Sequence, residues 1–214
     1  MHETVGVVLQ IRRGTLQALL WRRALAPFAG RWALPGGRLE RETLERSIRR
    51  HLAAKVDVRE LSHLEQLETR ADSRSGQVTT AYLGLIRSGV DPAVPGDTAW
   101  HPVDDLPPTA FDHGQLALAA RERLRAKLSY TNVGFALAPP DFTIAELRGL
   151  YRAALGHDVS ATNLQRILLR RALLEPTGEQ RPPGRAGGRP AAVYRFRNRS
   201  LAVTDQFAIL RPPS

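Results

Sequence analysis

The feature that most constrains this chain is the stretch WALPGGRLERETLERSIRRHLAAKVDV, residues 32–58, in which a short turn leads directly into a helical pattern. A proline followed by two glycines, at 35–37, predicts a tight turn in which glycine supplies a positive φ. From Leu44 to Val56 an apolar residue recurs at every fourth position, with charged residues between, which predicts an amphipathic helix. Strand-like segments lie on both sides of this helix, so the stretch indicates a larger domain with both helix and strand.

These strand-like segments are rich in β-branched or apolar residues. Residues 4–12 and 16–23 are separated by Arg-Gly-Thr, which predicts a hairpin. Two more strands are expected at about 61–70 and 79–86, and the polar, proline-rich residues 99–114 are expected to be a connection without regular structure. We therefore assign residues 1–112 to one α+β domain of ordinary size.

The second half of the chain predicts helices. Residues 115–128 have the helical period and no breaker, so we assign residues 113–140 to a linking helix and a connector. The next helix is expected to start with a capping box formed by Thr143 and Glu146, and to end at Gly156 as its C-cap.

A further helix is expected after a short connection, with Ser160 as its N-cap, which is the spacing of a helix-turn-helix. Residues 173–178 and 191–196 are expected to be strands on either side of a polar, arginine-bearing loop. Two helices and a hairpin in this order are typical of a winged helix, so residues 141–214 are expected to form a second domain.

The length of the chain agrees with two domains, and its composition indicates the cellular compartment. The 214 residues are enough for two hydrophobic cores. The chain has no cysteine, which excludes disulfides and thiolate metal sites. The N-terminus lacks the basic start and long apolar core of a signal peptide, and no apolar run has the length of a membrane span. We expect a cytoplasmic protein that does not contact membranes.

The positive charge of the chain lies in its second half. The formal net charge is +10; residues 1–120 carry 15 Lys/Arg against 14 Asp/Glu (+1), and residues 121–214 carry 16 against 7 (+9). This asymmetry favours a polyanionic partner for the C-terminal domain, the alternative being a basic surface that only contacts solvent.

The second helix of the helix-turn-helix is expected to be the recognition helix. Its apolar residues fall on one side and its polar residues on the other, and the N-terminal polar residues of such a helix contact base edges. Asparagine pairs with adenine and arginine with guanine, while arginines in the loop between the strands suit the phosphate backbone or a minor groove. The residues that we assign to DNA contact are Ser160, Thr162, Asn163, Arg166, Arg170, Arg181, Arg185 and Arg189.

The turn and helix of residues 36–58 resemble the Nudix box, G-x5-E-x7-R-E-U-x-E-E-x-G-U, where U is aliphatic. In that family the glutamates of the helix bind Mg²⁺, which bridges a pyrophosphate, and activate the attacking water. Here Gly37 and Arg50 match the pattern, with one residue fewer between them than the family has. At the positions of the next three glutamates stand His51, Ala54 and Lys55, and Asp57 replaces the glycine.

The departure from the box predicts a pocket without hydrolysis. Alanine and a cation cannot supply the carboxylate oxygens that Mg²⁺ requires, so we expect no catalytic residue and no metal site, although Glu40, Glu42 and Glu45 keep a residual site conceivable. Arginine can hold phosphate oxygens without a metal, and aromatic rings can stack on a base. The residues that we assign to a ligand are Arg23, Arg31, Trp32, Gly36, Gly37, Arg50, Phe111, Asp112 and His113.

The order of a degenerate Nudix domain, a linking helix and a winged helix resembles the Nudix-related transcriptional regulators of NAD metabolism, the NrtR family. The resemblance spans almost the whole chain, and it implies that the N-terminal domain is an α/β/α sandwich with a mixed sheet. It implies a homodimeric repressor that binds palindromic double-stranded DNA near NAD-biosynthesis or salvage genes, and that releases it on binding ADP-ribose or a related nucleotide, with no cofactor required. The alternatives are a working Nudix hydrolase of a nucleoside diphosphate with an accessory basic domain, and an RNA-binding adaptor.

Overall fold

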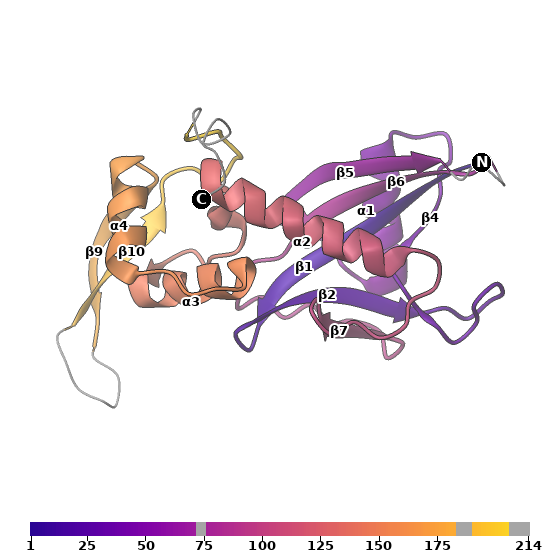
Figure 1. The fold of residues 1–214 in the computed structure, drawn as a ribbon, viewed down its shortest axis with the longest axis horizontal. Helices are drawn as coiled ribbons and strands as arrows, with labels where there is room; N and C mark the ends of the chain where they lie inside the picture. Colours follow the sequence, from indigo (N-terminus) through magenta and orange to yellow (C-terminus); the bar gives the residue numbers. More distant parts are fainter. Residues whose placement is uncertain (72–75, 183–189, 206–214) are drawn as a thin grey trace. The chain divides into compact units, whose positions relative to one another are not determined.

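The protein is described from a computed structural model, which covers residues 1–71, 76–182 and 190–205 (Figure 1). It divides into two compact units, Met1–Arg123 and Leu124–Ser214, and each is described by itself. The boundary falls inside a helix rather than in a loop.

The first unit is built on one mixed sheet. Its strands are β1 (His2–Arg12), β2 (Thr15–Arg22), β3 (Trp32–Ala33), β4 (Gly36–Arg38), β5 (His63–Ala71), β6 (Val78–Leu85) and β7 (Thr98–Pro102). The order is β3-β2-β1-β6-β5, with β4 paired to β1 and β7 paired to β2. The central pair β1–β6 is parallel, whereas the other pairs are antiparallel. The sheet is therefore mixed, as the family resemblance implies.

The hairpin of β1 and β2 is closed by a two-residue turn. Arg12 pairs with Thr15, and the residues between them, Arg13 and Gly14, both have positive φ, 51° and 76°. Two central residues with positive φ match the right-handed twist of the flanking strands, which makes this the favoured hairpin turn. The predicted hairpin is confirmed, with its turn one residue shorter than expected.

The predicted amphipathic helix is α1 (Leu44–Val56). It starts at Thr43, whose hydroxyl accepts a hydrogen bond from the Arg46 N–H, and it ends at Asp57, which has a positive φ of 52°. Asp57 stands at the position of the glycine in the Nudix box, and glycine is the usual residue at a left-handed C-cap. The apolar side chains Ile48, Leu52 and Val56 are fully buried against the sheet.

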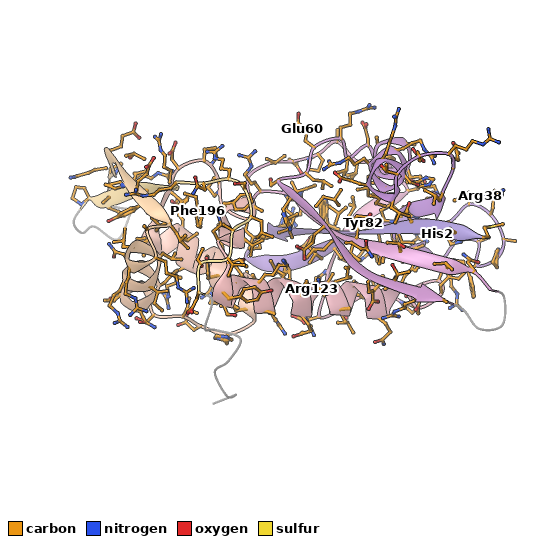
Figure 2. The ribbon with its side chains drawn as sticks, turned by 90° about the horizontal axis from the view of Figure 1, so that it is seen from above. His2, Arg38, Glu60, Tyr82, Arg123 and Phe196 are labelled. Carbon is orange, nitrogen blue, oxygen red and sulfur yellow. The ribbon has the colours of Figure 1, made fainter. Side chains whose placement is uncertain are left out.

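The sheet lies between two helices, which makes an α/β/α sandwich. The helix α2 (His113–Tyr130) starts in the first unit and ends in the second. In Figure 2 the sheet that carries Tyr82 lies between α1 on one side and α2, which carries Arg123, on the other. The face of α2 that turns inward is small and apolar, with Leu116, Ala117 and Ala120 buried.

Two expectations for this unit are wrong. Residues 99–114 are not all irregular, because β7 pairs with β2 along five residues. Gly36 and Gly37 do not supply a positive φ; they lie in β4, where they have to be glycine for lack of space. A Cβ on Gly36 would lie 2.4 Å from the Thr4 carbonyl oxygen, and one on Gly37 would lie 2.6 Å from Cε1 of His51. The two glycines let β4 pack against β1 and α1.

The second unit is a winged helix. After the end of α2 come the 3-10 helix η1 (Val133–Ala136), β8 (Phe142–Thr143), α3 (Ile144–Leu155), α4 (Ala161–Arg170), β9 (Leu174–Arg181) and β10 (Ala191–Phe196). The strands form an antiparallel sheet in the order β8-β10-β9. The short β8 was not predicted, since two residues carry no period.

The caps of the two helices are as expected from the sequence. The Thr143 hydroxyl accepts from the Glu146 N–H while the Glu146 carboxylate accepts from the Thr143 N–H at 2.7 Å, and Gly156 ends α3 with a φ of 79°. Ser160 caps α4. No helix among residues 1–71, 76–182 and 190–205 is long and apolar enough to cross a membrane.

Candidate functional site

A pocket of about 940 Å³ opens in the first unit, within the range usual for small-molecule sites. Its walls come from β1, the end of β2, β4, α1, the facing ends of β5 and β6, and the start of α2. The lining residues are Glu3, Val5, Trp21, Arg23, Pro27, Leu34, Gly36, Gly37, Lys55, Arg70, Ala71, Gln77, Thr79, Phe111, Asp112, His113 and Leu116.

His113 joins the start of α2 to the wall of this pocket. Its side chain is buried, and Nδ1 accepts a hydrogen bond from the Leu34 N–H at 3.0 Å. Burial lowers the pKa of His113 to about 4, because the low-dielectric surroundings disfavour the imidazolium. The ring is therefore neutral at physiological pH, with its proton on Nε2, since Nδ1 is an acceptor.

Three cations line the pocket. Arg23 donates from Nε to the Pro27 carbonyl at 2.9 Å, and its guanidinium carbon lies 5.0 Å from the ring centre of Phe111. Lys55 projects from α1 with Nζ 4.4 Å from the ring centre of Trp21. Arg70 forms an ion pair with Asp112 at 2.6 Å. The pocket thus presents positive charge next to aromatic rings, a combination that suits a phosphorylated aromatic ligand.

Two exposed aromatic side chains stand beside the pocket. Phe111 is 49% exposed and has a positive φ of 55°, which is rare for a bulky residue. Phe28 is 43% exposed, and the two ring centres are 5.0 Å apart in an edge-to-face arrangement. Exposed rings held in this way provide a surface on which a nucleobase can stack.

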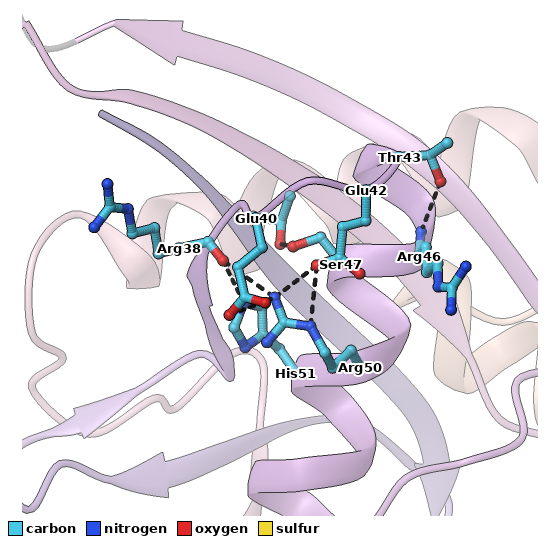
Figure 3. Close-up of polar contacts among 9 residues, drawn as sticks. Arg38, Glu40, Glu42, Thr43, Arg46, Ser47, Arg50 and His51 are labelled. Atoms are coloured by element: carbon cyan, nitrogen blue, oxygen red, sulfur yellow. Dashed lines mark hydrogen bonds and ion pairs between the residues drawn. The ribbon is translucent and has the colours of Figure 1, made fainter.

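The acids that remain in the degenerate box are paired with arginine, and Figure 3 shows Glu40 and Glu42 beside Arg50. Arg50 donates to Glu42 from Nε at 3.0 Å and from Nη2 at 2.6 Å, and it lies 3.5 Å from Glu40. The hydrogen bond from Arg50 lowers the pKa of Glu42 below its usual range. Glu45 forms an i,i+4 pair with Arg49 at 3.0 Å. These carboxylates are each held by a cation of the same region.

The box positions do not fit a magnesium site. His51 donates from Nε2 to the Arg38 carbonyl at 3.0 Å, and burial lowers its pKa, so it serves as a neutral packing residue beside Gly37. Ala54 has no ligand atom and Lys55 brings a positive charge. In the described part of the chain no three His, Asp or Glu side chains gather as they would around a metal ion.

The pocket brings together six of the nine ligand residues predicted from the sequence, namely Arg23, Gly36, Gly37, Phe111, Asp112 and His113. The other three are not in its lining. Arg31 lies over Phe28, with its guanidinium carbon 5.8 Å from the ring centre; Trp32 packs edge-on against His101; Arg50 is held by Glu42.

The sequence prediction missed several residues of the lining, above all Lys55, Arg70 and Trp21. Lys55 carries a signal, since it stands at a box position, but the box pattern indicates only that a metal ligand is lost there. Arg70 and Trp21 carried none, because only the sheet order brings β5 and β2 to the same pocket.

In the second unit, α4 presents a polar face. Thr162, Asn163, Arg166 and Arg170 are exposed, while Leu164 and Leu168 are buried. Ser160 accepts from the Asn163 N–H at 3.3 Å as the N-cap, and the Asn163 carbonyl oxygen accepts from Arg166 at 2.7 Å. Asn163 and Arg166 are therefore held side by side near the start of the helix.

The turn before α4 is fixed by Arg148. This side chain donates to the Val159 carbonyl at 2.7 Å and to the Asp158 carboxylate at 2.6 Å. The hydrogen bond from Arg148 lowers the pKa of Asp158. An arginine of α3 thereby sets where α4 begins, and with it where the polar face points.

The arginines predicted for the wing fall into two groups. The prediction that Arg181 lies in the loop is wrong, because it is the last residue of β9; its guanidinium contacts Glu146 and donates to the Asp141 carbonyl at 2.9 Å. The strand continues past the glycine at 178, which has a positive φ of 86°, because β10 supplies backbone partners for residues 180 and 181. Arg185 and Arg189 lie outside the described residues.

Known protein families match the unit that contains the pocket and the unit that contains the polar helix separately. The NUDIX domain family matches residues 1–121, and the NrtR DNA-binding winged helix domain matches residues 134–196. A curated relative, the ADPR responsive transcriptional repressor NtrR of Acinetobacter baylyi, is 31% identical over 88% of this chain and 79% of its own length. This chain belongs to the NrtR family.

Solved NrtR structures share the fold. The crystal structure of Shewanella oneidensis NrtR is 35% identical, with a TM-score of 0.78 over 92% of this chain and 94% of its own. The same NrtR complexed with a 27mer DNA is similar at a TM-score of 0.75, 34% identity, and coverage of 91% and 93%. Its NUDIX domain complexed with ADP ribose is 35% identical with a TM-score of 0.51, covering 58% of this chain and 88% of that chain.

Proposed function

We propose that this protein is a DNA-binding transcriptional repressor whose Nudix-like domain binds ADP-ribose, or a related metabolite of NAD, and then releases DNA. One observation carries the proposal: the pocket keeps cations and aromatic rings for a nucleoside diphosphate, although the acids of the box are replaced or paired with arginine. Such a pocket binds its ligand without consuming it. Two NrtR relatives, an ADPR responsive repressor and a protein crystallised with DNA, support the same assignment.

The ligand would be held by Arg23, Lys55 and Arg70 through its phosphates, and by Phe111 through its base. Gly36 and Gly37 support this arrangement because the lack of side chains lets β4 pack closely on β1 and α1, where it forms part of the pocket wall. Arg31, Trp32 and Arg50 are not part of this proposal, since none of them lines the pocket.

We infer that the domain has lost hydrolase activity. Attack on a diphosphate in the Nudix family requires carboxylates that hold Mg²⁺ and activate water. His51, Ala54 and Lys55 cannot form that set, and Glu42 is neutralised by Arg50. The observation supports a sensor, and release of AMP from ADP-ribose with Mg²⁺, lost on Glu42→Gln, would instead support an enzyme.

DNA contact is assigned to the exposed face of α4. Asn163 and Arg166 lie near its N-terminus, where a recognition helix meets base edges, and Thr162 and Arg170 flank them. Ser160 is occupied as the cap, so its contribution is to orient the helix. Arg185 and Arg189, which lie outside the described residues, are proposed from the sequence alone to contact the DNA backbone. We further propose that two copies read a palindromic site, and that the protein acts in the cytoplasm.

The test is a fluorescence-anisotropy titration on DNA from upstream of the NAD-metabolism genes of the same genome, against a scrambled sequence, at fixed salt. We expect preference for the genomic DNA and a loss of that preference when ADP-ribose is added. Equal binding of both DNAs would contradict the repressor assignment.

A matched pair of variants separates the pocket from the rest of the domain. Arg23→Met removes a cation that lines the pocket and should make the DNA complex resistant to ADP-ribose. Arg50→Met removes a cation outside the pocket and should leave the response unchanged. The reverse order of effects would mean that the ligand binds at the box rather than in this pocket.

A further inference from the structure

Lys55 stands where the Nudix box has a glutamate, and its side chain lines the pocket. Its ammonium lies over the ring of Trp21, 4.4 Å from the centre, on the same side of α1 as the buried core residues Leu52 and Val56. A position that in the family contributes to holding a cation therefore carries a cation itself.

This ammonium has no counter-ion of its own. Throughout the described residues no carboxylate forms an ion pair with Lys55, although Glu3 lies near enough to favour its charged form. Burial lowers the pKa of Lys55, and the positive charge of Arg23 lowers it further. Two cations that repel each other across a pocket are both stabilised when an anion binds between them.

The charges of the lining leave room for such an anion. Three cations, Arg23, Lys55 and Arg70, face two carboxylates, Glu3 and Asp112. Because Asp112 is bonded to Arg70 at 2.6 Å, the balance near Lys55 is two cations against one carboxylate, a net +1. Glu40 and Glu42 are not counted in this balance, because neither lines the pocket and both are paired with Arg50.

We propose that the ammonium of Lys55 replaces the divalent cation of the Nudix box and binds the diphosphate of the effector directly, so that binding needs no metal. The inference rests on the proposed function, since it takes ADP-ribose as the effector. An ammonium is a compact charge with three donors, which can reach oxygens of both phosphates. It does not coordinate water or lower the pKa of a bound water as a metal ion does. The same exchange would thus keep the ligand bound and leave it intact.

The experiment is isothermal titration calorimetry of the full chain with ADP-ribose, once in buffer with EDTA and once with excess Mg²⁺. We expect dissociation constants that agree within about twofold. Lys55→Met removes the charge and should weaken binding about tenfold or more in both buffers, the loss expected for a hydrogen bond to a charged group. Lys55→Arg should keep metal-free binding.

The chain offers a matched control, because Lys127 is the one other lysine in the sequence and lies in the second unit. Lys127→Met should bind ADP-ribose as the unchanged protein does. Circular dichroism shows whether Lys55→Met is folded, and Lys55→Gln, a second neutral variant, provides the measurement if it is not.

Two results would overturn the inference alone. The first is that EDTA abolishes the binding of ADP-ribose and Mg²⁺ restores it. The second is that Lys55→Met and Lys55→Gln are both folded and bind ADP-ribose with unchanged affinity. In either case ADP-ribose would remain the effector. Absence of binding in both buffers would overturn the effector assignment and the inference together.

Discussion

Acid should weaken the first unit in part through His113, whose pKa is lowered by burial. Its pKa is about 4 in the folded protein and near 6.5 when exposed, so the unfolded chain binds more protons between these values. The stability that the neutral ring contributes to the folded protein is therefore present above about pH 6.5 and is lost as the pH falls towards 4. Between about pH 7 and pH 5 the difference in proton binding amounts to about 2 kcal/mol of unfolding free energy.

The variant His113→Asn isolates this effect. The asparagine carbonyl oxygen can accept the Leu34 N–H in place of Nδ1, and it does not titrate. Urea unfolding followed by tryptophan fluorescence reports on the first unit, because all three tryptophans, at positions 21, 32 and 100, lie in it. Other groups titrate in both proteins, so the difference between the two curves of stability against pH belongs to His113.

The expected result is a curve for the unchanged protein that falls about 2 kcal/mol further than the curve of His113→Asn over this pH range. His157→Asn, which removes an exposed histidine of the second unit, should leave the curve as it is. Parallel curves for the unchanged protein and His113→Asn would refute the reasoning, because they would mean that His113 is solvated in the folded state.

Three further predictions concern the scaffold and the polar helix. Gly36→Ala should lower the unfolding free energy of the first unit by about 3 kcal/mol in urea, because the new Cβ would meet the Thr4 carbonyl oxygen at 2.4 Å. A decrease of less than about 1 kcal/mol would show that β4 can shift. Thr143→Ala should lower the stability of the second unit by about 1 kcal/mol, measured by urea unfolding followed by circular dichroism, since it removes one half of the capping box; an unchanged midpoint would contradict the role of the cap. Arg166→Ala should cost about 1–3 kcal/mol of binding to the genomic DNA and little on scrambled DNA, measured by anisotropy; an equal loss on both would make Arg166 a phosphate contact.

Local patterns in the sequence predicted most of the secondary structure. The hairpin of β1 and β2 follows from alternation around Arg13 and Gly14, and α3 follows from the pairing of Thr143 with Glu146. The strand β7 was missed because its five residues, with a proline at 102, show no strand pattern and depend on β2 for their partner.

The site was less predictable, because it depends on which segments meet. Arg50 looked like a phosphate ligand in the sequence, but Glu42, eight residues away, holds it outside the pocket. Gly36 and Gly37 line the pocket, but the positive φ predicted for them is wrong, since they are glycine because β1 and α1 leave no space for a side chain. Arg70 joins the pocket only through the pairing of β5 with β6.

The continuous helix α2 restricts how such a chain can evolve. The boundary between the two units lies between residues 123 and 124, inside this helix, and Ala120, Leu124 and Leu128 near it are buried. An exchange of domains between genes succeeds most readily at an exposed, flexible joint. A crossover at this boundary would instead join two half-helices and would need both their hydrogen bonds and their buried faces to match. The two domains are therefore expected to be inherited together rather than exchanged separately between genes.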